Sequence, residues 1–397
     1  MHKFRAGIKT AALFTTLFIG SAHIAPAFAQ ANSIFPSGWD NNVRSRLFMR
    51  LGYTSAFTKT KSDDARDITG NVVSRQELKQ ALNTGLALQA DCGSATPTAS
   101  VADCNRYVNS GDANAYAFAG TLLFGGTSAA DPDLNAAPEA DSFFGATGLN
   151  GIGAPVGIKA KAQRHVGTPT ISLGYWLDDS RKWLIEAYVL AAPLNIKIYG
   201  DGVRADGVTP NTVNGQHIAS TKMLPPLVIG SYNFGDAQSM IRPYVGVGAM
   251  YAIFFDGRTT GFFDEYIGGK TTLTTKNTFG FGPFVGISSP INDDWHVNLS
   301  VGQVALKATS RLVTSNTQIT SQSAVLKDFS ATNDQGFADF PNLNQLGEDA
   351  WSSGDFTTRL MELVKRNRNS DNLGTYVREQ KMKITNTIVT LSIGRSF

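Results

Sequence analysis

After its first 30 residues the sequence lacks any apolar run long enough for a membrane-spanning helix. Such a helix needs about 20 consecutive, mainly apolar residues, and polar residues or glycine interrupt every later apolar stretch of this 397-residue chain sooner than that. A helical membrane protein is therefore excluded as an interpretation of the remaining chain. We expect either an exported soluble protein or a protein that crosses a membrane with β-strands.

The chain also lacks an excess of positive charge once its first residues are set aside. The formal net charge is +3, and the first 29 residues carry Lys3, Arg5 and Lys9 but no acid. Without these residues the net charge is zero. Nucleic-acid binding requires a concentrated positive surface, so nucleic acid is not an expected partner.

Cysteine is scarce, with only Cys92 and Cys104, twelve positions apart in a polar stretch. In an exported chain, an even pair at this spacing predicts a disulfide within a surface loop. A metal site is not predicted, because no histidine or second cysteine pair lies nearby with ligand spacing. We likewise predict no cofactor.

Histidine is nearly absent, which disfavours an enzyme. Beyond the first 29 residues the chain contains only His165, His217 and His296, and they are widely separated. A barrel enzyme of the lipid-hydrolase kind would need a serine, a histidine and an acid together on one rim. Only His296 has candidates nearby, with Asp294 in a turn and Ser300 four residues on. Catalysis stays a third alternative.

The N-terminus predicts a secretory signal peptide over residues 1–29. A basic start precedes an apolar core over 11–25, and Ala27 and Ala29 place small residues at the positions of an A-x-A cleavage site. The core is short for a membrane span and ends at Pro26.

The C-terminal residues read as a strand for an outer membrane. Val389, Leu391, Ile393 and Phe397 share one apolar face, because alternate residues of a strand lie on the same side. The opposite face is polar. This alternation is typical of transmembrane β-barrels. The terminal Phe397 resembles the signal that bacterial barrel-insertion machinery recognises, so we expect that machinery as a partner.

Seven further segments alternate in the same way, and their connections alternate in length. The predicted strands cover about 44–57, 168–177, 183–198, 224–234, 242–255, 277–287, 295–307 and 383–397. Short turns alternate with long connections, as periplasmic turns and external loops do in outer-membrane barrels. We therefore predict an all-β fold over 30–397: an eight-stranded antiparallel transmembrane β-barrel in a Gram-negative outer membrane. Two long external loop insertions cover about 58–167 and 308–382.

Both long loops contain helix signals. Ser74 and Glu77 match a capping box before a helical pattern, and Asp355 could begin a helix that runs through Arg368. The basic cluster at 365–368 has two interpretations. It is either a solvated helix end, where cations are favourable, or a contact for lipopolysaccharide phosphates. Outer-membrane lipid and lipopolysaccharide are thus expected surroundings and partners.

The strand phase places specific side chains inside the barrel. Arg46, Arg50 and Glu186 lie opposite apolar lipid-facing rows, so we predict that they form an internal charge network, since an unpaired buried charge is costly. Four large inward-facing side chains are the candidates for an apolar ligand path and constriction: Phe48, Trp176, Tyr188 and Met250.

A series of motifs between positions 168 and 256 resembles the OmpW family of outer-membrane proteins. The motifs are Thr168-Pro169-Thr170, 174–179, 186–194, Leu224-Pro225-Pro226, 232–234, 242–248 and Phe254-Phe255-Asp256. Two features depart from the family pattern: the first and last external loops are longer, and Leu194 replaces a phenylalanine. The resemblance implies an eight-stranded barrel associated with passage of small hydrophobic molecules into the membrane.

Three functions remain open at this stage. An uptake channel for small hydrophobic solutes predicts an apolar cleft with an opening between strands, because a barrel of eight strands is just wide enough for side chains to fill. A structural or adhesive surface protein predicts a lumen closed by Arg and Glu and a compact loop cap. An enzyme predicts a Ser/His/acid cluster on one rim.

Overall fold

The computed structural model describes residues 41–107, 151–152, 157–203, 208, 210–319, 323 and 355–397. The predicted signal peptide lies outside these ranges. The helices are α3 (Asn41–Arg44), α4 (Arg75–Cys92), α5 (Val101–Tyr107), α8 (Gly261–Ile267) and α12 (Asp355–Arg368). In the described part of the chain, no helix is long and apolar enough to cross a membrane.

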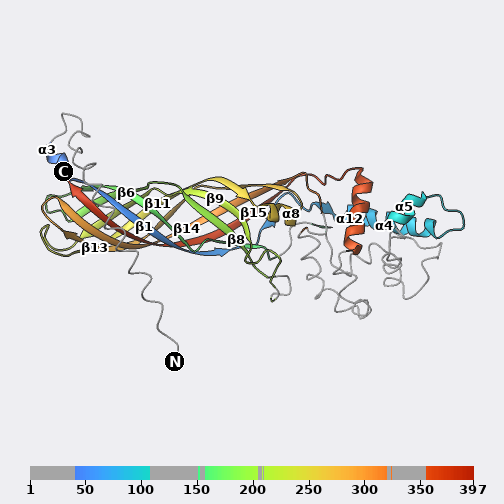
Figure 1. Ribbon diagram of the computed structural model, residues 1–397, viewed down its shortest axis with the longest axis horizontal. Helices are drawn as coiled ribbons and strands as arrows, with labels where there is room; N and C mark the ends of the chain where they lie inside the picture. The colour runs from blue at the N-terminus through green and yellow to red at the C-terminus, as the bar shows by residue number, and fades with distance from the viewer. Residues whose placement is uncertain are drawn as a thin grey trace, which may run out of the picture.

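Most of the described residues form one antiparallel sheet that closes on itself (Figure 1). The ring is formed by β1 (Leu47–Ser62), β6 (His165–Trp176), β7 (Trp183–Leu190), β10 (Leu227–Asn233), β11 (Arg242–Thr259), β13 (Thr278–Pro290), β14 (Trp295–Ser315) and β15 (Tyr376–Ser396). Each pairs with the next in this order, and β15 pairs with β1. The antiparallel barrel predicted from sequence is confirmed.

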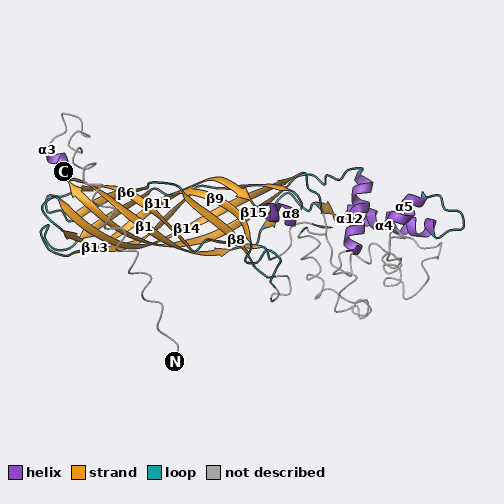
Figure 2. Cartoon of the chain, in the orientation of Figure 1, coloured by secondary structure: helices purple, strands orange, loops and turns teal. Residues whose placement is uncertain are grey.

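Four other strands replace some of these toward the end of the barrel that carries the long connections. There β5 (Lys159–Ala162), β8 (Leu194–Asp201), β9 (His217–Leu224) and β12 (Lys270–Thr275) continue the wall in line with β6, β7, β10 and β13 (Figure 2). The third predicted strand, 183–198, is therefore two strands. Three short strands lie in the first long connection: β2 (Arg66–Asp67), β3 (Val73–Ser74) and β4 (Gly151–Ile152).

The two faces of the wall alternate as the sequence predicted. On β14 the even-numbered residues from Asn298 to Leu312 are buried inside, while the odd-numbered ones point out. The outward residues of the barrel form an exposed apolar band that suits lipid. It includes Ile171, Leu173, Ile185, Val189, Val228, Val245, Val247, Phe279, Phe281, Val285, Ile287, Leu299 and Val301.

The strands are longer than predicted, so the long connections are shorter than 58–167 and 308–382. β1 extends to Ser62, β14 reaches Ser315 and β15 begins at Tyr376. The exposed side chains of these extensions are all charged: Lys59 and Lys61 on β1, Arg311 on β14 and Lys381 on β15. The apolar alternation ends where lipid contact ends, whereas the backbone hydrogen bonds continue beyond it.

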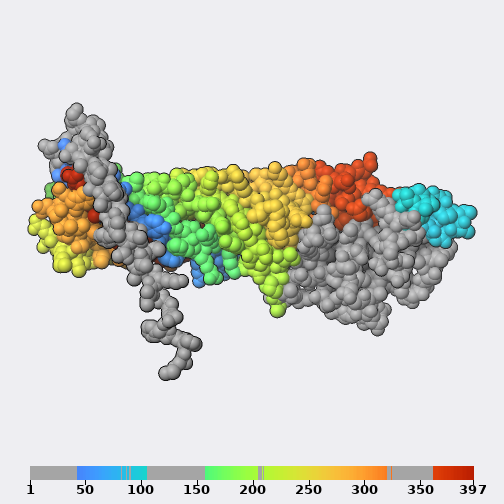
Figure 3. Space-filling model, in the orientation of Figure 1, coloured from blue at the N-terminus to red at the C-terminus, as the bar shows by residue number. Residues whose placement is uncertain are grey.

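A small helical cap covers the end of the barrel where the long connections lie. The Ser74 N–H donates to the Glu77 carboxylate at 2.8 Å and the Glu77 N–H donates to Ser74 Oγ at 3.3 Å, so the predicted capping box begins α4. A disulfide joins Cys92 at the end of α4 to Cys104 in α5. The cap continues the long axis of the barrel (Figure 3).

The basic cluster at 365–368 holds this cap together. Arg368 donates to Glu77 Oε1 at 2.7 Å, to the Leu373 carbonyl at 2.7 Å and to the Val72 carbonyl at 3.0 Å. Arg366 pairs with Asp103 at 3.2 Å. These contacts fasten α12 to α4 and α5, so the arginines of the cluster serve the cap itself rather than a solvated helix end.

Arg368→Ala should loosen α12 from α4. The change removes one ion pair and two carbonyl contacts, and we expect the free energy of local opening to fall by about 1–2 kcal/mol. Hydrogen exchange of the α12 amides measures this opening. Arg311→Ala, an exposed arginine on β14, is the control and should leave α12 unchanged; equal protection in both variants would contradict the assignment.

Acid should open the same contact. Burial alone would raise the pKa of Glu77, but hydrogen bonds from Ser74 and the pair with Arg368 lower it below its ordinary value of 4.5. Because folding lowers the pKa of Glu77, its carboxylate stabilises the folded state at pH values above 4.5. This stabilisation is lost as the pH falls through the lowered pKa. Protection factors in α12 should hold from neutral pH to about 5 and fall below about 4.5. Glu77→Gln should remove this step; a step of the same size would refute the role of Glu77.

Candidate functional site

The lumen is closed near the short-turn end by a cluster of rings. Phe48, Trp176 and Leu184 are buried together. The rings of Phe48 and Trp176 lie 5.7 Å apart, and the Arg242 guanidinium stands over the Trp176 ring at 5.3 Å. Gly174 makes room for this packing, because a Cβ there would overlap the Phe48 ring. We call these side chains the floor of the lumen.

A buried ion pair lies directly beside the floor. Arg50 Nη1 donates to Glu186 Oε2 at 2.5 Å, and both residues are at most 3% exposed. Ser172 Oγ donates to the other carboxylate oxygen of Glu186 at 2.5 Å, and Arg50 Nε donates to His296 Nε2 at 2.9 Å. The guanidinium also lies 4.3 Å from the centre of the Phe48 ring. Side chains from several strands thus pair with or hydrogen-bond to both charges, as buried charges require.

Arg46, the third residue of the predicted network, does not join this pair. It precedes β1 and donates to Asp179 Oδ1 at 2.5 Å, in the turn between β6 and β7. The Asp179 side chain is 87% exposed. Arg46 lies before the first residue of the strand, and its partner lies on the rim of the barrel.

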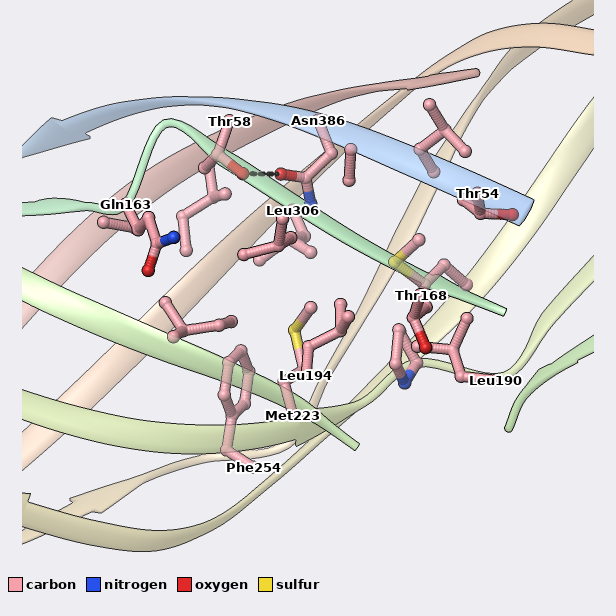
Figure 4. Close-up of a pocket in the computed structure, with 18 of the residues that line it drawn as sticks. Thr54, Thr58, Gln163, Thr168, Leu190, Leu194, Met223, Phe254, Leu306 and Asn386 are labelled. Atoms are coloured by element: carbon pink, nitrogen blue, oxygen red, sulfur yellow. Dashed lines mark hydrogen bonds between the residues drawn. The ribbon is translucent and has the colours of Figure 1, made fainter. Parts of the chain in front are cut away.

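Above the ion pair the barrel encloses an apolar cavity that is partly open to solvent (Figure 4). Its wall comes from nearly every strand and is mostly aliphatic, with threonines and Asn386 as the main polar groups. The residues include Thr54, Thr58, Thr168, Tyr188, Leu190, Leu194, Met223, Met250, Phe254, Leu306, Asn386 and Ile388. Ligand sites commonly combine such a surface with a few polar groups.

A second, smaller cavity adjoins the first. The two share Ile198 and Met382 in their walls, and the second includes Phe263, Leu312 and Arg378. These residues lie on the stretch of the barrel nearer the cap. The apolar interior therefore extends from the ion pair toward the long connections.

Two of the four predicted path residues line the cavity and two do not. Tyr188 and Met250 are part of its wall. Phe48 and Trp176 belong instead to the floor, on the other side of the Arg50–Glu186 pair. Sequence reasoning could establish that all four face inward but not their height along the barrel, so it could not separate a floor from a cavity.

Three of the cavity residues are not among the ligand-path candidates that the sequence predicted. Leu194 begins β8 immediately after a break, and Met223 lies on β9, which was assigned to a loop. Phe254 continues the inward row of Met250 along β11, so the alternation itself could have identified it.

The wall beside the cavity is interrupted. The Ala191 N–H donates to the Pro169 carbonyl at 3.0 Å, and the next bond along this edge runs from the Gln163 N–H to the Lys197 carbonyl at 2.8 Å. Between these bonds, within the described residues, no strand pairing joins β6 to β8. Thr168, Leu190 and Leu194 line the cavity at this interruption (Figure 4).

Prolines account for the interruption. Pro169 lies in β6, Pro193 precedes β8, and Pro225 and Pro226 separate β9 from β10. Proline has no N–H to donate to a neighbouring strand, so it is found at strand edges and irregularities. The backbone hydrogen bonds between neighbouring strands therefore stop on both sides of this interruption.

Glu186→Gln should strongly destabilise the barrel, because it leaves the Arg50 charge buried without its partner. We expect a loss of about 3–5 kcal/mol in the free energy of unfolding. The double variant Arg50→Met with Glu186→Leu should recover much of this loss. Urea unfolding in lipid vesicles measures both. Asp179→Asn, which breaks the exposed Arg46 pair, should cost less than about 1 kcal/mol; equal losses for Glu186→Gln and Asp179→Asn would contradict the assignment.

Comparison with known proteins agrees with this architecture. The family model described as OmpW family matches residues 146–326. Outer membrane protein W of Escherichia coli K12 is 38% identical over 121 residues, which cover 30% of this chain and 50% of that protein. Outer membrane protein W of Vibrio cholerae is 33% identical over 141 residues, which cover 35% of this chain and 59% of that protein. The chain thus spans about half the length of these relatives.

Among solved structures, the crystal structure of the outer membrane protein OprG from Pseudomonas aeruginosa aligns over 89% of this chain and 96% of its own, with 12% identity and a TM-score of 0.43. The family-model match covers the segment that carries the motifs described above, and the fold is a closed antiparallel barrel. Over that segment the chain is similar to the OmpW family of outer-membrane proteins.

Proposed function

We propose that the protein takes up small hydrophobic molecules through the outer membrane and releases them sideways into the bilayer. The main support is the position of the apolar cavity, which lies beside the proline-rich interruption of the wall. A hydrophobic solute in this cavity is surrounded by aliphatic side chains and borders a place where few backbone bonds join adjacent strands.

The floor supports a sideways exit over a straight passage. A solute moving toward the short-turn end would meet the buried Arg50–Glu186 pair and then the Phe48 and Trp176 rings. Separating that pair leaves a charge uncompensated in an apolar setting, at a cost of several kcal/mol. Moving through the interruption requires no charge separation.

The anchor alternative has support of its own. A lumen closed by Arg and Glu and a compact helical cap are the features that it predicts, and both are present. An anchor has no use for an apolar cavity next to a wall interruption, however, because filling that space with side chains would stabilise it. The cavity therefore favours uptake.

The enzyme alternative gains little support. His217 Nε2 lies 2.9 Å from Ser220 Oγ, but in the described part of the chain no carboxylate bonds to the His217 ring. His296 contacts Arg50 instead of a serine. In the described residues no group of three or more His, Cys, Asp or Glu side chains could hold a metal ion. The relatives are outer-membrane proteins and do not belong to enzyme families.

Filling the cavity should stop uptake. Leu194→Trp places a large ring where β8 meets the interruption, and we expect uptake of a radiolabelled alkane to fall roughly tenfold, which corresponds to a barrier higher by about 1.4 kcal/mol. Cells that lack the protein and carry wild type, variant or empty vector provide the measurement. Asn195→Trp, on the exposed face of the same strand, is the matched control.

The amount of folded barrel in the membrane should be measured for each variant by its heat-dependent gel mobility. If wild type, Leu194→Trp and empty vector take up the alkane equally, the uptake proposal fails and the anchor function remains. If Asn195→Trp reduces uptake as much as Leu194→Trp, the effect does not come from the cavity.

A further inference from the structure

The outer surface of the barrel carries a row of lysines that face one another across three adjacent strands. In the strand register, Lys61 of β1 lies opposite Lys383 of β15, and Lys383 lies opposite Lys307 of β14. All three are exposed. Lys59 lies on the same face of β1, two residues before Lys61. We call Lys61, Lys307 and Lys383 the lysine row.

The lysine row is electrostatically unfavourable on its own. Directly opposite residues on antiparallel strands have Cβ atoms about 5 Å apart, and like charges in this position repel. In the described residues no ion pair joins an acid to any of the three lysines. Of the nearby acids, Asp64 lies 3.8 Å from Lys159 and Glu379 lies 3.9 Å from Lys381. Asp63 follows Lys61 by two residues, and among the described residues it forms no ion pair with the lysine row.

On the opposite wall of the barrel, two cations are paired with an acid of the protein. There Lys222 and Arg258 both pair with Asp256, at 2.7 and 2.8 Å. The protein itself supplies the acid for these two cations, whereas Lys197 of the same wall faces Ser220 instead of another lysine. The contrast indicates that the neutralising anion of the lysine row comes from outside the chain.

The height of the lysine row identifies the surroundings. Lys307 follows Trp295 by twelve residues on β14. At about 3.3 Å per residue and a strand tilt of about 40°, this raises Lys307 by about 30 Å along the barrel axis. An outer-membrane barrel has an apolar band about 25 Å tall. The lysine row thus stands just beyond the hydrocarbon, at the level of the head groups on the side of the long connections.

We propose that the lysine row binds the phosphate groups of lipid A, the phosphorylated glycolipid anchor of lipopolysaccharide. Lysine is a compact point charge that suits phosphate oxygens, and clustered basic residues at a membrane surface attract anionic head groups. Three ammonium groups span about 10 Å across adjacent strands. The acyl chains of the lipid then lie along the apolar outer face below them, which carries Leu299 and Val301 on β14.

The proposal predicts opposite effects of one variant in two environments. In neutral detergent, replacing Lys61, Lys307 and Lys383 together by Gln removes repulsion, so the temperature of heat unfolding should stay equal or rise. In vesicles that contain lipopolysaccharide, the same variant should unfold at a lower temperature than wild type. The triple replacement of Lys197, Lys270 and Lys276 by Gln removes equal charge from other exposed positions and is the control.

Direct binding separates the phosphate from the rest of the lipid. The purified full chain in neutral detergent is titrated with lipid A and with lipid A whose phosphates have been removed, and bound lipid is counted by native mass spectrometry. We expect lipid A to bind the lysine-row variant about tenfold more weakly than it binds wild type or the control. Loss of the phosphates should weaken binding to wild type by a similar factor.

Several results would overturn the proposal. They are equal binding of lipid A to wild type and the lysine-row variant, equal binding of the dephosphorylated lipid to wild type, or an equal loss in the control variant. The detergent measurement shows whether the variant folds, so misfolding is not confused with lost binding. Uptake of the alkane does not enter either measurement, so this proposal and the uptake proposal can fail separately.

Discussion

The closure of β15 onto β1 is the interaction on which the rest of the structure depends. This pairing runs from Phe48 opposite Ser396 to Ser62 opposite Met382. In lipid no water is available to satisfy an open strand edge, so a sheet can span the membrane only as a closed ring. The register matters as much as the bonds, because a slip by one residue would turn Arg50 toward lipid. The register of closure therefore places Arg50 inside the barrel, within reach of Glu186.

The same closure limits where the wall can open. Along most of the ring, separating two strands would leave unsatisfied N–H and carbonyl groups facing hydrocarbon, each at a cost of several kcal/mol. At Pro169, Pro193, Pro225 and Pro226 there is no N–H to lose. These residues lie around the interruption beside Leu190 and Leu194. An opening there disturbs fewer backbone groups than an opening anywhere along the continuous ladders, such as that between β14 and β15.

Much of the architecture could be predicted because lipid imposes a strict alternation. The outward row of Leu299 and Val301 and the inward row of Asn298 and Ser300 follow directly from the sequence. The capping box at Ser74 and Glu77 also identifies its helix, since the same residues provide the reciprocal hydrogen bonds. In both cases the deciding interactions are local or periodic, so a single sequence contains them.

The remaining features depend on contacts between distant segments. Alternation shows that Phe48 and Tyr188 face inward, but only the strand register places one in the floor and the other in the cavity. The partners of Arg368 come from α4 and from the loop before β15, far apart in the chain. The ends of β14 and β15 were missed because hydrogen-bonded strands outside lipid need no apolar face.

The floor of the lumen has an electrical consequence. At one height the barrel is filled by Arg50, Glu186, Phe48 and Trp176, and a hydrated ion would have to shed its water to pass them. We therefore expect the barrel to add little ionic conductance to the membrane that holds it. Insulation against current follows from a few side chains that also fix the register of the wall.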